Sequence, residues 1–374
     1  MKNFQSGRLV QQAHYKSFQP TPINRAWSID DMGLIQLLGQ ADRELGRLDM
    51  YSEYIPNIDL FIRMHVLKEA SQSSRIEGTQ TTMEEALLDK EDVAPEKRDD
   101  WEEVQNYVAA MNQAVGRLQK LPFSARLMRE THKTLMQGVR GKHKQPGEFR
   151  HSQNWIGGAS INDAVFIPPS HETIGGLISD IEKFVHNEQA YFPELLKAAL
   201  VHYQFETIHP FLDGNGRVGR LLITLYLVSR GILKQPVLYL SDFFERNRQL
   251  YYDNLMRVRE KNDLRQWFSF FLVGVIETAK SSTATFDNIL KLQKQVETQL
   301  QTLGSRTANA QKVMYYLYQR PVIDAAKAGE VAEVSAASAY RLIADMERFG
   351  ILKEVTGAKR GKMYVFEAYL KLFK

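Results

Sequence analysis

The stretch His209–Arg220 reads HPFLDGNGRVGR and joins two segments with helical patterns. Before it, residues 193–208 (PELLKAALVHYQFETI) repeat apolar side chains at steps of three and four, which is typical of one face of an α-helix. After it, residues 218–228 (VGRLLITLYLV) form a long apolar run that suits a buried helix. The sequence therefore predicts a mostly α-helical protein in which a glycine-rich turn leads into the N-terminus of a buried helix.

The residue types in this turn are suited to binding an anion. The first N–H groups of a helix lack intrahelical partners, and the macrodipole makes that end positive. Gly214 and Gly216 allow backbone amides to approach a phosphate closely. Arg217 and Arg220 can each donate two hydrogen bonds to phosphate oxygens, and Asn215 can donate from its amide. The predicted phosphate-binding residues are Gly214, Asn215, Gly216, Arg217, Val218, Gly219 and Arg220.

Two further residues of the stretch carry chemistry. Asp213 is a hard oxygen ligand beside two arginines, so it either pairs with them or holds a divalent cation. A single carboxylate together with substrate phosphates is a common way to bind Mg²⁺. His209 titrates near neutral pH and can accept a proton from a hydroxyl group. The alternative is a glycine-rich connection with an Asp–Arg surface pair and an unrelated histidine, although no packing requirement asks for all of these residues together.

The stretch closely resembles the signature of the Fic family, HxFx(D/E)GNGRxxR, and matches it at every fixed position. The resemblance implies transfer of AMP from ATP to a Ser, Thr or Tyr hydroxyl of a protein, with Mg²⁺ as cofactor and release of pyrophosphate. Two other functions remain open. The nucleotide-binding core could serve a transcriptional regulator, or the enzyme could transfer a different phosphate-linked group or remove AMP again.

The family resemblance also implies a role for each residue of the motif. His209 would be the base that deprotonates the attacking hydroxyl, and Asp213 would hold Mg²⁺ between the α- and β-phosphates. Asn215 and the neighbouring glycine amides would form the anion hole for the α-phosphate. Arg217 and Arg220 would bind the β- and γ-phosphates.

A second motif lies at the end of a predicted helix over residues 58–76. Gly78 is typical of a residue that ends a helix in the left-handed conformation. Glu77 then stands at the helix C-terminus, where the macrodipole disfavours a carboxylate. It is either a solvated residue beside a glycine stop or the partner of a cation elsewhere. Ser73, Glu77 and Gly78 match the Fic inhibitory motif (S/T)xxxE(G/N), and this resemblance implies that Glu77 faces Arg220 and inhibits the enzyme.

Two more segments gain a function only through the resemblance. Residues 146–170 contain β-prone pieces at Asn154–Ile156 and Val165–Ile167, which predict a hairpin or a packed loop. The resemblance makes this the Fic flap, whose edge at Val165, Phe166 and Ile167 would align a target segment by strand addition.

The second of these segments is the predicted helix at residues 241–259. Tyr251, Tyr252 and Asn254 lie where Fic proteins place the wall of the adenine pocket. An aromatic pair on a helix is equally consistent with a core position.

The composition sets limits on the class of protein. The chain has 374 residues, which allows two or three domains, and a net charge of +4, which does not require nucleic acid as a partner for the whole chain. It has no cysteine, no apolar signal-peptide core and no apolar run of about 18 residues. We therefore expect a cytoplasmic protein with no membrane span.

The chain divides into three predicted regions. These are an N-terminal helical region at 1–110 with the inhibitory motif, a Fic catalytic core at 111–300, and a domain at 310–374. The first 25 residues are expected to be extended, with Ser28 or Asp30 capping a helix from Asp31 to about Arg47. Two separate helices, 267–278 and 285–303, are expected to end the core.

The last region is predicted to contain three helices followed by a hairpin, an order that resembles a winged helix (α+β). It has 11 Lys and Arg against 7 Asp and Glu, with Lys359, Arg360 and Lys362 at the hairpin tip. Residues 335–364 could therefore contact DNA, or the same fold could contact protein. A homodimer is left open.

Overall fold

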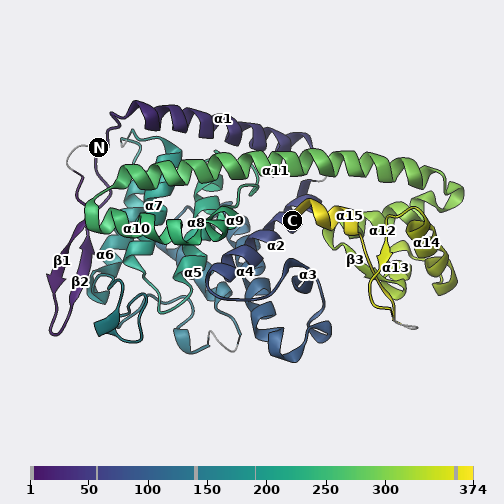
Figure 1. Cartoon of the computed structure of the whole chain (residues 1–374), viewed down its shortest axis with the longest axis horizontal. Coiled ribbons are helices and arrows are strands. Elements are labelled where there is room, and N and C mark those ends of the chain that lie inside the picture. The colour runs from purple at the N-terminus through teal and green to yellow at the C-terminus, as the bar shows by residue number, and fades with distance from the viewer. Residues whose placement is uncertain (1–3, 56–57, 139–141, 190, 358–360, 374) are drawn as a thin grey trace.

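The computed structural model describes residues 4–55, 58–138, 142–189, 191–357 and 361–373. These residues form an elongated and mostly helical molecule, with an N-terminal hairpin at one end and the C-terminal region at the other (Figure 1). The helices are α1 (Met32–Tyr54), α2 (Ile58–Ile76), α3 (Met83–Ala86), α4 (Arg98–Leu118), α5 (Ala125–Leu135), α6 (Ile174–His186), α7 (Glu194–Ile208), α8 (Asn215–Ser229), α9 (Ser241–Arg246), α10 (Arg248–Lys261), α11 (Leu264–Gln301), α12 (Thr307–Gln319), α13 (Ala325–Ala332), α14 (Ala336–Arg348) and α15 (Glu367–Leu370). The strands are β1 (Gly7–Gln11), β2 (Lys16–Pro20), β3 (Val322–Asp324), β4 (Lys353–Glu354) and β5 (Met363–Val365).

Helices α7 and α8 form the centre of the molecule, as their apolar sequences predict. Nearly every side chain of both helices is buried, which is the pattern of a helix enclosed on all sides. The turn between them uses two left-handed residues. His209 has φ 50° and Gly214 has φ 72°, so α7 ends at the first and α8 begins after the second. The glycine-rich stretch is therefore held rigidly between two core helices.

The predicted helix over residues 58–76 is confirmed as α2. Gly78 follows it with φ 102°, a conformation that favours glycine. The first long helix differs from expectation, since α1 extends to Tyr54. Its cap is Asp31, which accepts a hydrogen bond from the Leu34 N–H at 2.8 Å, so the prediction of Ser28 or Asp30 as cap was wrong. A carboxylate placed three residues before the bonded amide gives the usual N-cap geometry.

The N-terminal residues form structure that the sequence did not predict. β1 and β2 pair as an antiparallel hairpin instead of crossing the surface as a single extended segment. The hairpin is attached to the rest of the protein, because the Phe18 N–H donates to the Ile167 carbonyl at 2.9 Å. The Ser6 hydroxyl donates to Asn262 Oδ1 at 2.8 Å.

The predicted hairpin in residues 146–170 is reduced to a single antiparallel bridge between Ile156 and Phe166. Gly157 and Gly158 have φ 70° and 74°, and a methyl group on Gly158 would overlap the Asp163 carbonyl. The chain therefore turns tightly directly after Ile156, which leaves no room for a longer ladder. We keep the name flap for residues 154–168.

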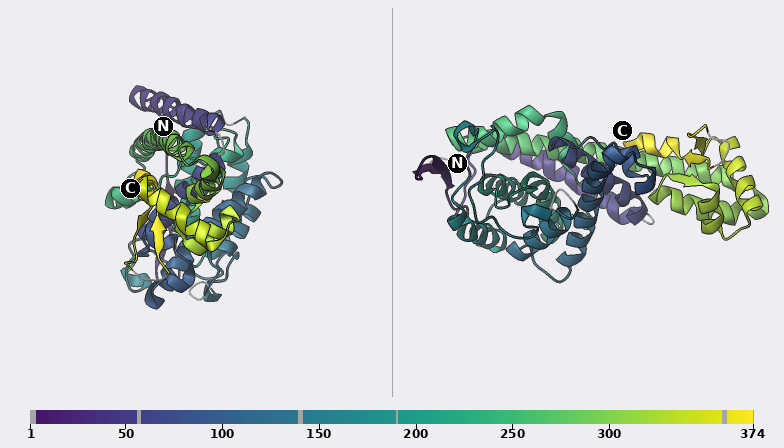
Figure 2. Two further views of the ribbon diagram at one scale, coloured as in Figure 1. Left: turned by 90° about the vertical axis from the view of Figure 1, so that its right-hand side faces the viewer. Right: turned by 90° about the horizontal axis from the view of Figure 1, so that it is seen from below.

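The two helices expected at residues 267–278 and 285–303 are one continuous helix, α11, of 38 residues. Between the two predicted pieces lies AKSSTA (residues 279–284), which contains neither glycine nor proline to end a helix. Helix α11 runs along the long axis beside α1 and leads to the C-terminal region (Figure 1). Figure 2 shows the C-terminal region as a compact extension beyond the main body.

The C-terminal region contains the three expected helices, α12 to α14, followed by the hairpin strands β4 and β5, but β3 and α15 were not predicted from the sequence. The three strands form a sheet in the order β3-β5-β4. Of its predicted basic tip, Lys359 and Arg360 lie outside the described residues, while Lys362 is exposed. The region packs against α2: the rings of Phe61 and Tyr318 are 5.5 Å apart. Among the helices in the described ranges, none is long and apolar enough to cross a membrane.

Candidate active site

The backbone of the motif loop is held in place by one buried arginine. Arg150 is only 1% exposed. Its guanidinium donates to the carbonyls of His209 at 3.0 Å, Ser152 at 3.0 Å and Pro169 at 2.6 Å. Burial lowers the pKa of Arg150 to about 10, so it stays charged at neutral pH. No sequence pattern marks this residue, because a single arginine in a Gly- and Pro-rich segment has no distinctive spacing.

The imidazole of His209 is neutral at neutral pH. Burial lowers its pKa to about 3, and the positive charges of Arg259 and Arg150 act in the same direction against the smaller opposite effect of Glu77. Its Nδ1 atom is buried and has no hydrogen-bond partner among the described residues. A neutral imidazole with a free nitrogen can accept a proton, as the predicted base must.

The side chain of Asn215 holds the motif loop closed. Its Oδ1 accepts a hydrogen bond from the Phe211 N–H at 2.8 Å, and its Nδ2 donates to the Phe211 carbonyl at 2.9 Å. The bond from Nδ2 uses one of the two N–H groups of the amide. Donation from Asn215 to a phosphate therefore stays a prediction.

The inhibitory motif lies directly against the predicted phosphate site. Glu77 Oε1 is 2.7 Å from Arg220 Nη2. Arg220 also donates from Nε to the Ser73 hydroxyl and from Nη2 to the Ser73 carbonyl, each at 2.9 Å. Only 1% of the Arg220 side chain is exposed, against 36% for Glu77. The pair predicted between Glu77 and Arg220 is thus present.

The Glu77 carboxylate occupies the position above the first turn of α8. A methyl group built on Gly216 would overlap Glu77 Oε1, so only glycine leaves room for the carboxylate there. Burial opposes its ionisation, but the charge and hydrogen bond of Arg220 outweigh burial and hold the pKa of Glu77 below its ordinary value of 4.5. A negative group therefore already sits where the helix N-terminus favours an anion.

The second arginine of the motif is paired with a carboxylate that the sequence did not reveal. Arg217 Nη1 is 3.1 Å from Glu103 Oε2 on α4, and Arg217 Nη2 is 3.8 Å from Asp213 Oδ1. The same Asp213 oxygen accepts a hydrogen bond from the Gly214 N–H at 2.6 Å. Asp213 is 46% exposed and lies at the mouth of the site. Glu103 belongs to an ordinary amphipathic helix, so only the tertiary structure identifies it.

A buried histidine supports the loop from below. The His132 ring stacks on Phe211 with centroids 3.8 Å apart and planes 4° apart. Its Nδ1 accepts from the Gly147 N–H at 2.9 Å, so Nε2 carries the proton and donates to the Asp213 carbonyl at 3.1 Å. Burial lowers the pKa of His132 to about 4, which keeps the ring neutral. Phe211 is fully buried and anchors the loop.

The predicted adenine-pocket residues separate into core and surface positions. Tyr251 is 1% exposed and its hydroxyl is 2.9 Å from His202 Nε2. Since His202 Nδ1 must donate to the Gly219 carbonyl at 2.9 Å, Nε2 accepts from Tyr251. Tyr251 is therefore a core residue. Tyr252 is 37% exposed, and Asn254 Nδ2 donates to a backbone carbonyl of its own helix. Asn254 Oδ1 has no hydrogen-bond partner among the described residues, so Tyr252 and Asn254 stay predictions as contacts to a base.

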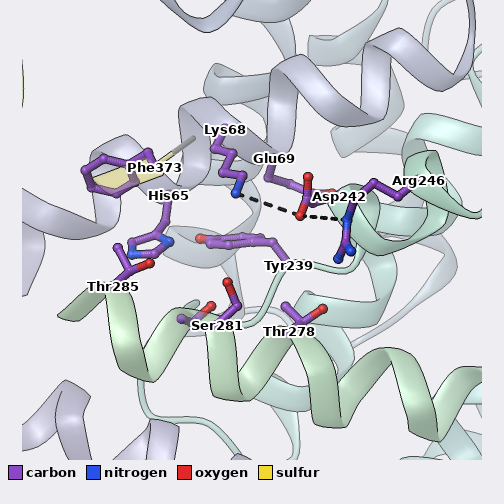
Figure 3. A pocket seen from close by; sticks show the side chains of 11 residues that line it. His65, Lys68, Glu69, Tyr239, Asp242, Arg246, Thr278, Ser281, Thr285 and Phe373 are labelled. Carbon is purple, nitrogen blue, oxygen red and sulfur yellow. Dashed lines mark ion pairs between the residues drawn. The ribbon is translucent and has the colours of Figure 1, made fainter. Parts of the chain in front are cut away.

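A second cavity lies between α2, α9, α11 and the C-terminal Phe373 (Figure 3). None of the motif residues lines it. Asp242 pairs with Lys68 at 3.8 Å and with Arg246 at 3.4 Å, as the dashed lines show. The buried Glu69 accepts hydrogen bonds from Tyr107 and Ser241. These charges are satisfied within the fold, so the cavity is part of the support for α2.

Two comparisons with protein families cover half of the chain. The Fic/DOC family N-terminal model matches residues 35–116, and the Fic/DOC family model matches residues 122–227. The second match contains the motif loop and both core helices. The first contains α2 and the inhibitory motif.

Comparison with curated proteins and solved structures gives the same family. The chain is 35% identical over 125 residues to Protein adenylyltransferase Fic of Aedes aegypti, which is 33% of this chain and 22% of that relative. It is 30% identical over 157 residues to the protein of the same name from Drosophila grimshawi, 41% of this chain and 29% of the relative. The chain thus spans less than a third of the length of these relatives.

The fold is similar to that of solved Fic proteins. A Fic family protein from Desulfovibrio desulfuricans G20 superposes with a TM-score of 0.58 at 18% identity, over 91% of this chain and 98% of that chain. Fic-1 from C. elegans superposes with a TM-score of 0.51 at 20% identity, over 70% of this chain and 74% of that one.

Proposed function

Because the chain belongs to the Fic/DOC family, we propose that it transfers AMP from ATP to a Ser, Thr or Tyr hydroxyl of a protein. One observation supports this most directly. A neutral histidine lies beside a helix N-terminus that carries two arginines and is already occupied by a carboxylate. That arrangement suits a base next to a triphosphate.

The reaction follows from these positions. The hydroxyl oxygen forms a bond to the α-phosphorus while its proton moves to the imidazole of His209. The bond between the α-phosphorus and the oxygen that bridges to the β-phosphate breaks, and pyrophosphate leaves with that oxygen. Arg217 and Arg220 neutralise the charge that develops on it. Asn215 contributes by holding the loop amides in place.

The residues present suit a magnesium ion only in the company of substrate. Within the described ranges, no group of three or more His, Asp or Glu side chains could hold a metal by itself. Asp213 is exposed at the mouth of the site and offers one carboxylate. Mg²⁺ at this position would take its other ligands from the phosphates and water, and would neutralise phosphate charge.

We further propose that Glu77 inhibits the enzyme. Its carboxylate takes a donor of Arg220 and places a negative charge above Gly216, where a phosphate of ATP must go. ATP could still bind with its phosphates out of line for attack, so the chemical step would suffer more than affinity. Ser73 holds α2 against Arg220 and keeps the carboxylate in this position.

Contact with DNA through residues 335–364, a homodimer and the winged-helix interpretation of 310–374 remain predictions. The function itself is tested by incubating the protein with α-labelled ATP and Mg²⁺ and measuring label on protein. A mass increase equal to AMP supports the proposal. Label transferred from a different nucleotide, or binding of ATP with no transfer by the uninhibited Glu77→Gly variant, would overturn it.

A further inference from the structure

A groove lies between the N-terminal hairpin, the flap and α10. The aromatic ring of the flap residue Phe166 forms the floor of the groove and contacts two other side chains. The Phe18 ring of β2 lies 5.7 Å away, and the guanidinium of Arg259 on α10 lies 3.9 Å from the Phe166 centroid. Three segments that are far apart in the sequence therefore build one surface.

The hairpin is a fixed wall of this groove. Ser6 bonds to Asn262 through both its N–H and its hydroxyl, at 2.7 and 2.8 Å. Tyr15 donates to Gln153 beside the flap at 3.4 Å. A side chain on Gly7 would overlap the Gln19 carbonyl and crowd the Phe18 ring, so glycine permits the close packing here. These contacts hold the hairpin against the flap.

The groove is connected to the helix that precedes the proposed base. Arg259, which lines the groove, donates to the Thr207 hydroxyl and to the Glu206 carbonyl, each at 3.2 Å. Both acceptors belong to the last turn of α7, whose C-cap residue is His209. Arg259 therefore joins the groove to the turn that carries the imidazole.

The lining of the groove is apolar and positively charged. Leu9 on β1 and Val165 on the flap are each 65% exposed, although both are aliphatic. Lys16 is exposed as well, lies on the same face of the hairpin as Phe18 and makes no ion pair within the described residues, while Glu260 is the single carboxylate of the lining. The strand register places Leu9 opposite Phe18, so Leu9 lies on the groove face of the hairpin. An unpaired cation beside exposed aliphatic side chains favours a partner with the complementary pattern.

The flap edge is already partly used. The Ile167 carbonyl accepts from the Phe18 N–H of β2, so a docking segment cannot pair with that group. Fewer backbone groups of the flap are therefore free to pair with a docking segment near Ile167, and such backbone pairing does not depend on the side chains of that segment. Side-chain contacts with the hairpin then carry more of the recognition.

We propose that this groove binds an extended segment of the target protein in which acidic and aliphatic side chains flank the modified hydroxyl. The inference rests on the proposed AMP transfer. Lys16 attracts the acidic side chains, and Leu9 with Val165 contacts the aliphatic ones. Basic segments are rejected by like charge at the same positions.

The test uses the full-length Glu77→Gly variant, so that inhibition does not mask the comparison. Synthetic dodecapeptides with one central Ser, Thr or Tyr are incubated with α-labelled ATP and Mg²⁺. Three sets differ only in the flanks, which are Asp and Leu, Lys and Leu, or Ala alone. We expect the acidic set to be labelled about tenfold faster or more than the basic set, a difference of about 1.4 kcal/mol.

Charge reversal in the groove provides the matched control. Lys16→Glu should abolish or invert the preference, whereas Lys294→Glu, with the same charge change on α11 outside the groove lining, should keep it. Equal labelling of the three peptide sets, or an unchanged order in Lys16→Glu, overturns the inference while leaving AMP transfer intact.

Two other outcomes are decisive. If the reversal changes only the oligomeric state and automodification, the groove is a contact between copies of the chain and the inference is wrong. If neither peptides nor the protein itself are labelled, AMP transfer is refuted, and the inference with it.

Discussion

Replacing Glu77 with glycine should raise the rate of AMP transfer, and the structure indicates by how much. The change removes the carboxylate that lies 2.7 Å from Arg220 and above Gly216. Arg220 keeps its two bonds to Ser73, so the guanidinium stays in place with a free donor. One charge-assisted hydrogen bond to a phosphate contributes about 1.5–3 kcal/mol. If that bond forms in the transition state, the rate rises about 10- to 100-fold.

The fold should tolerate this substitution. Glu77 lies after the end of α2 and its side chain is 36% exposed, and the buried Arg220 keeps its two hydrogen bonds to Ser73 when the carboxylate is removed. A large loss of thermal stability is therefore not expected. Glu77→Asp should raise the rate less, because a shorter carboxylate still carries its charge towards Arg220.

The assay is the initial rate of AMP incorporation for wild type, Glu77→Gly and Glu77→Gly/His209→Ala. ATP affinity is measured in parallel by titration calorimetry. The single variant should gain mainly in rate, and the double variant should lose the gain. Equal or lower incorporation by folded Glu77→Gly would refute the reasoning and leave Glu77 as a solvated residue beside a glycine stop.

His209→Ala should bind ATP nearly as well as wild type does. Its transfer rate, measured in the Glu77→Gly background, should fall by about 10²–10⁴-fold. An unchanged rate would show that His209 takes no part in the chemical step. Asp213→Ala should abolish Mg²⁺-dependent transfer, and activity that still requires Mg²⁺ would place the metal elsewhere. The pKa of Glu77 is lowered, so its ion pair persists above that pKa and is lost only as the pH falls through it. The ratio of the Glu77→Gly rate to the wild-type rate should therefore stay constant from about pH 8 to about pH 6. A fall in that ratio towards pH 6 contradicts this prediction. Arg150→Met should lower the free energy of unfolding by about 2–5 kcal/mol in urea titration, because several buried carbonyls lose their donor; a change below about 0.5 kcal/mol would show that water replaces it.

The parts of the site that lie close together in the sequence could be predicted. The motif loop contains its own base, carboxylate and arginines within twelve residues, so their proximity needs no knowledge of the fold. The contact of Glu77 with Arg220 is long-range and came from family resemblance, with the unfavourable helix end as independent support. The resemblance places Tyr251 in the wall of the adenine pocket, but its side chain is buried and its hydroxyl bonds to His202, while the phosphate contact assigned to Asn215 stays a prediction.

The supporting residues could not be found in the same way. Arg150, Glu103 and His132 come from three separate segments, and each looks ordinary in its own segment. Their importance arises from burial against the loop, which depends on how the helices pack. The N-terminal hairpin was missed for a related reason: its strands are short, and contacts with the flap and α10 hold them in place.

The continuity of α11 constrains where the chain can change in length. A 38-residue helix is about 57 Å long, and it joins the helices around the motif loop to the C-terminal region. One residue inserted in its second half would turn everything beyond by about 100° and advance it by about 1.5 Å. Tyr318 and Phe373 would then move off Phe61 and His65 on α2. Insertions and deletions between the two parts should therefore be confined to residues 302–306, because a change of length there does not rotate one part of a continuous helix relative to the other.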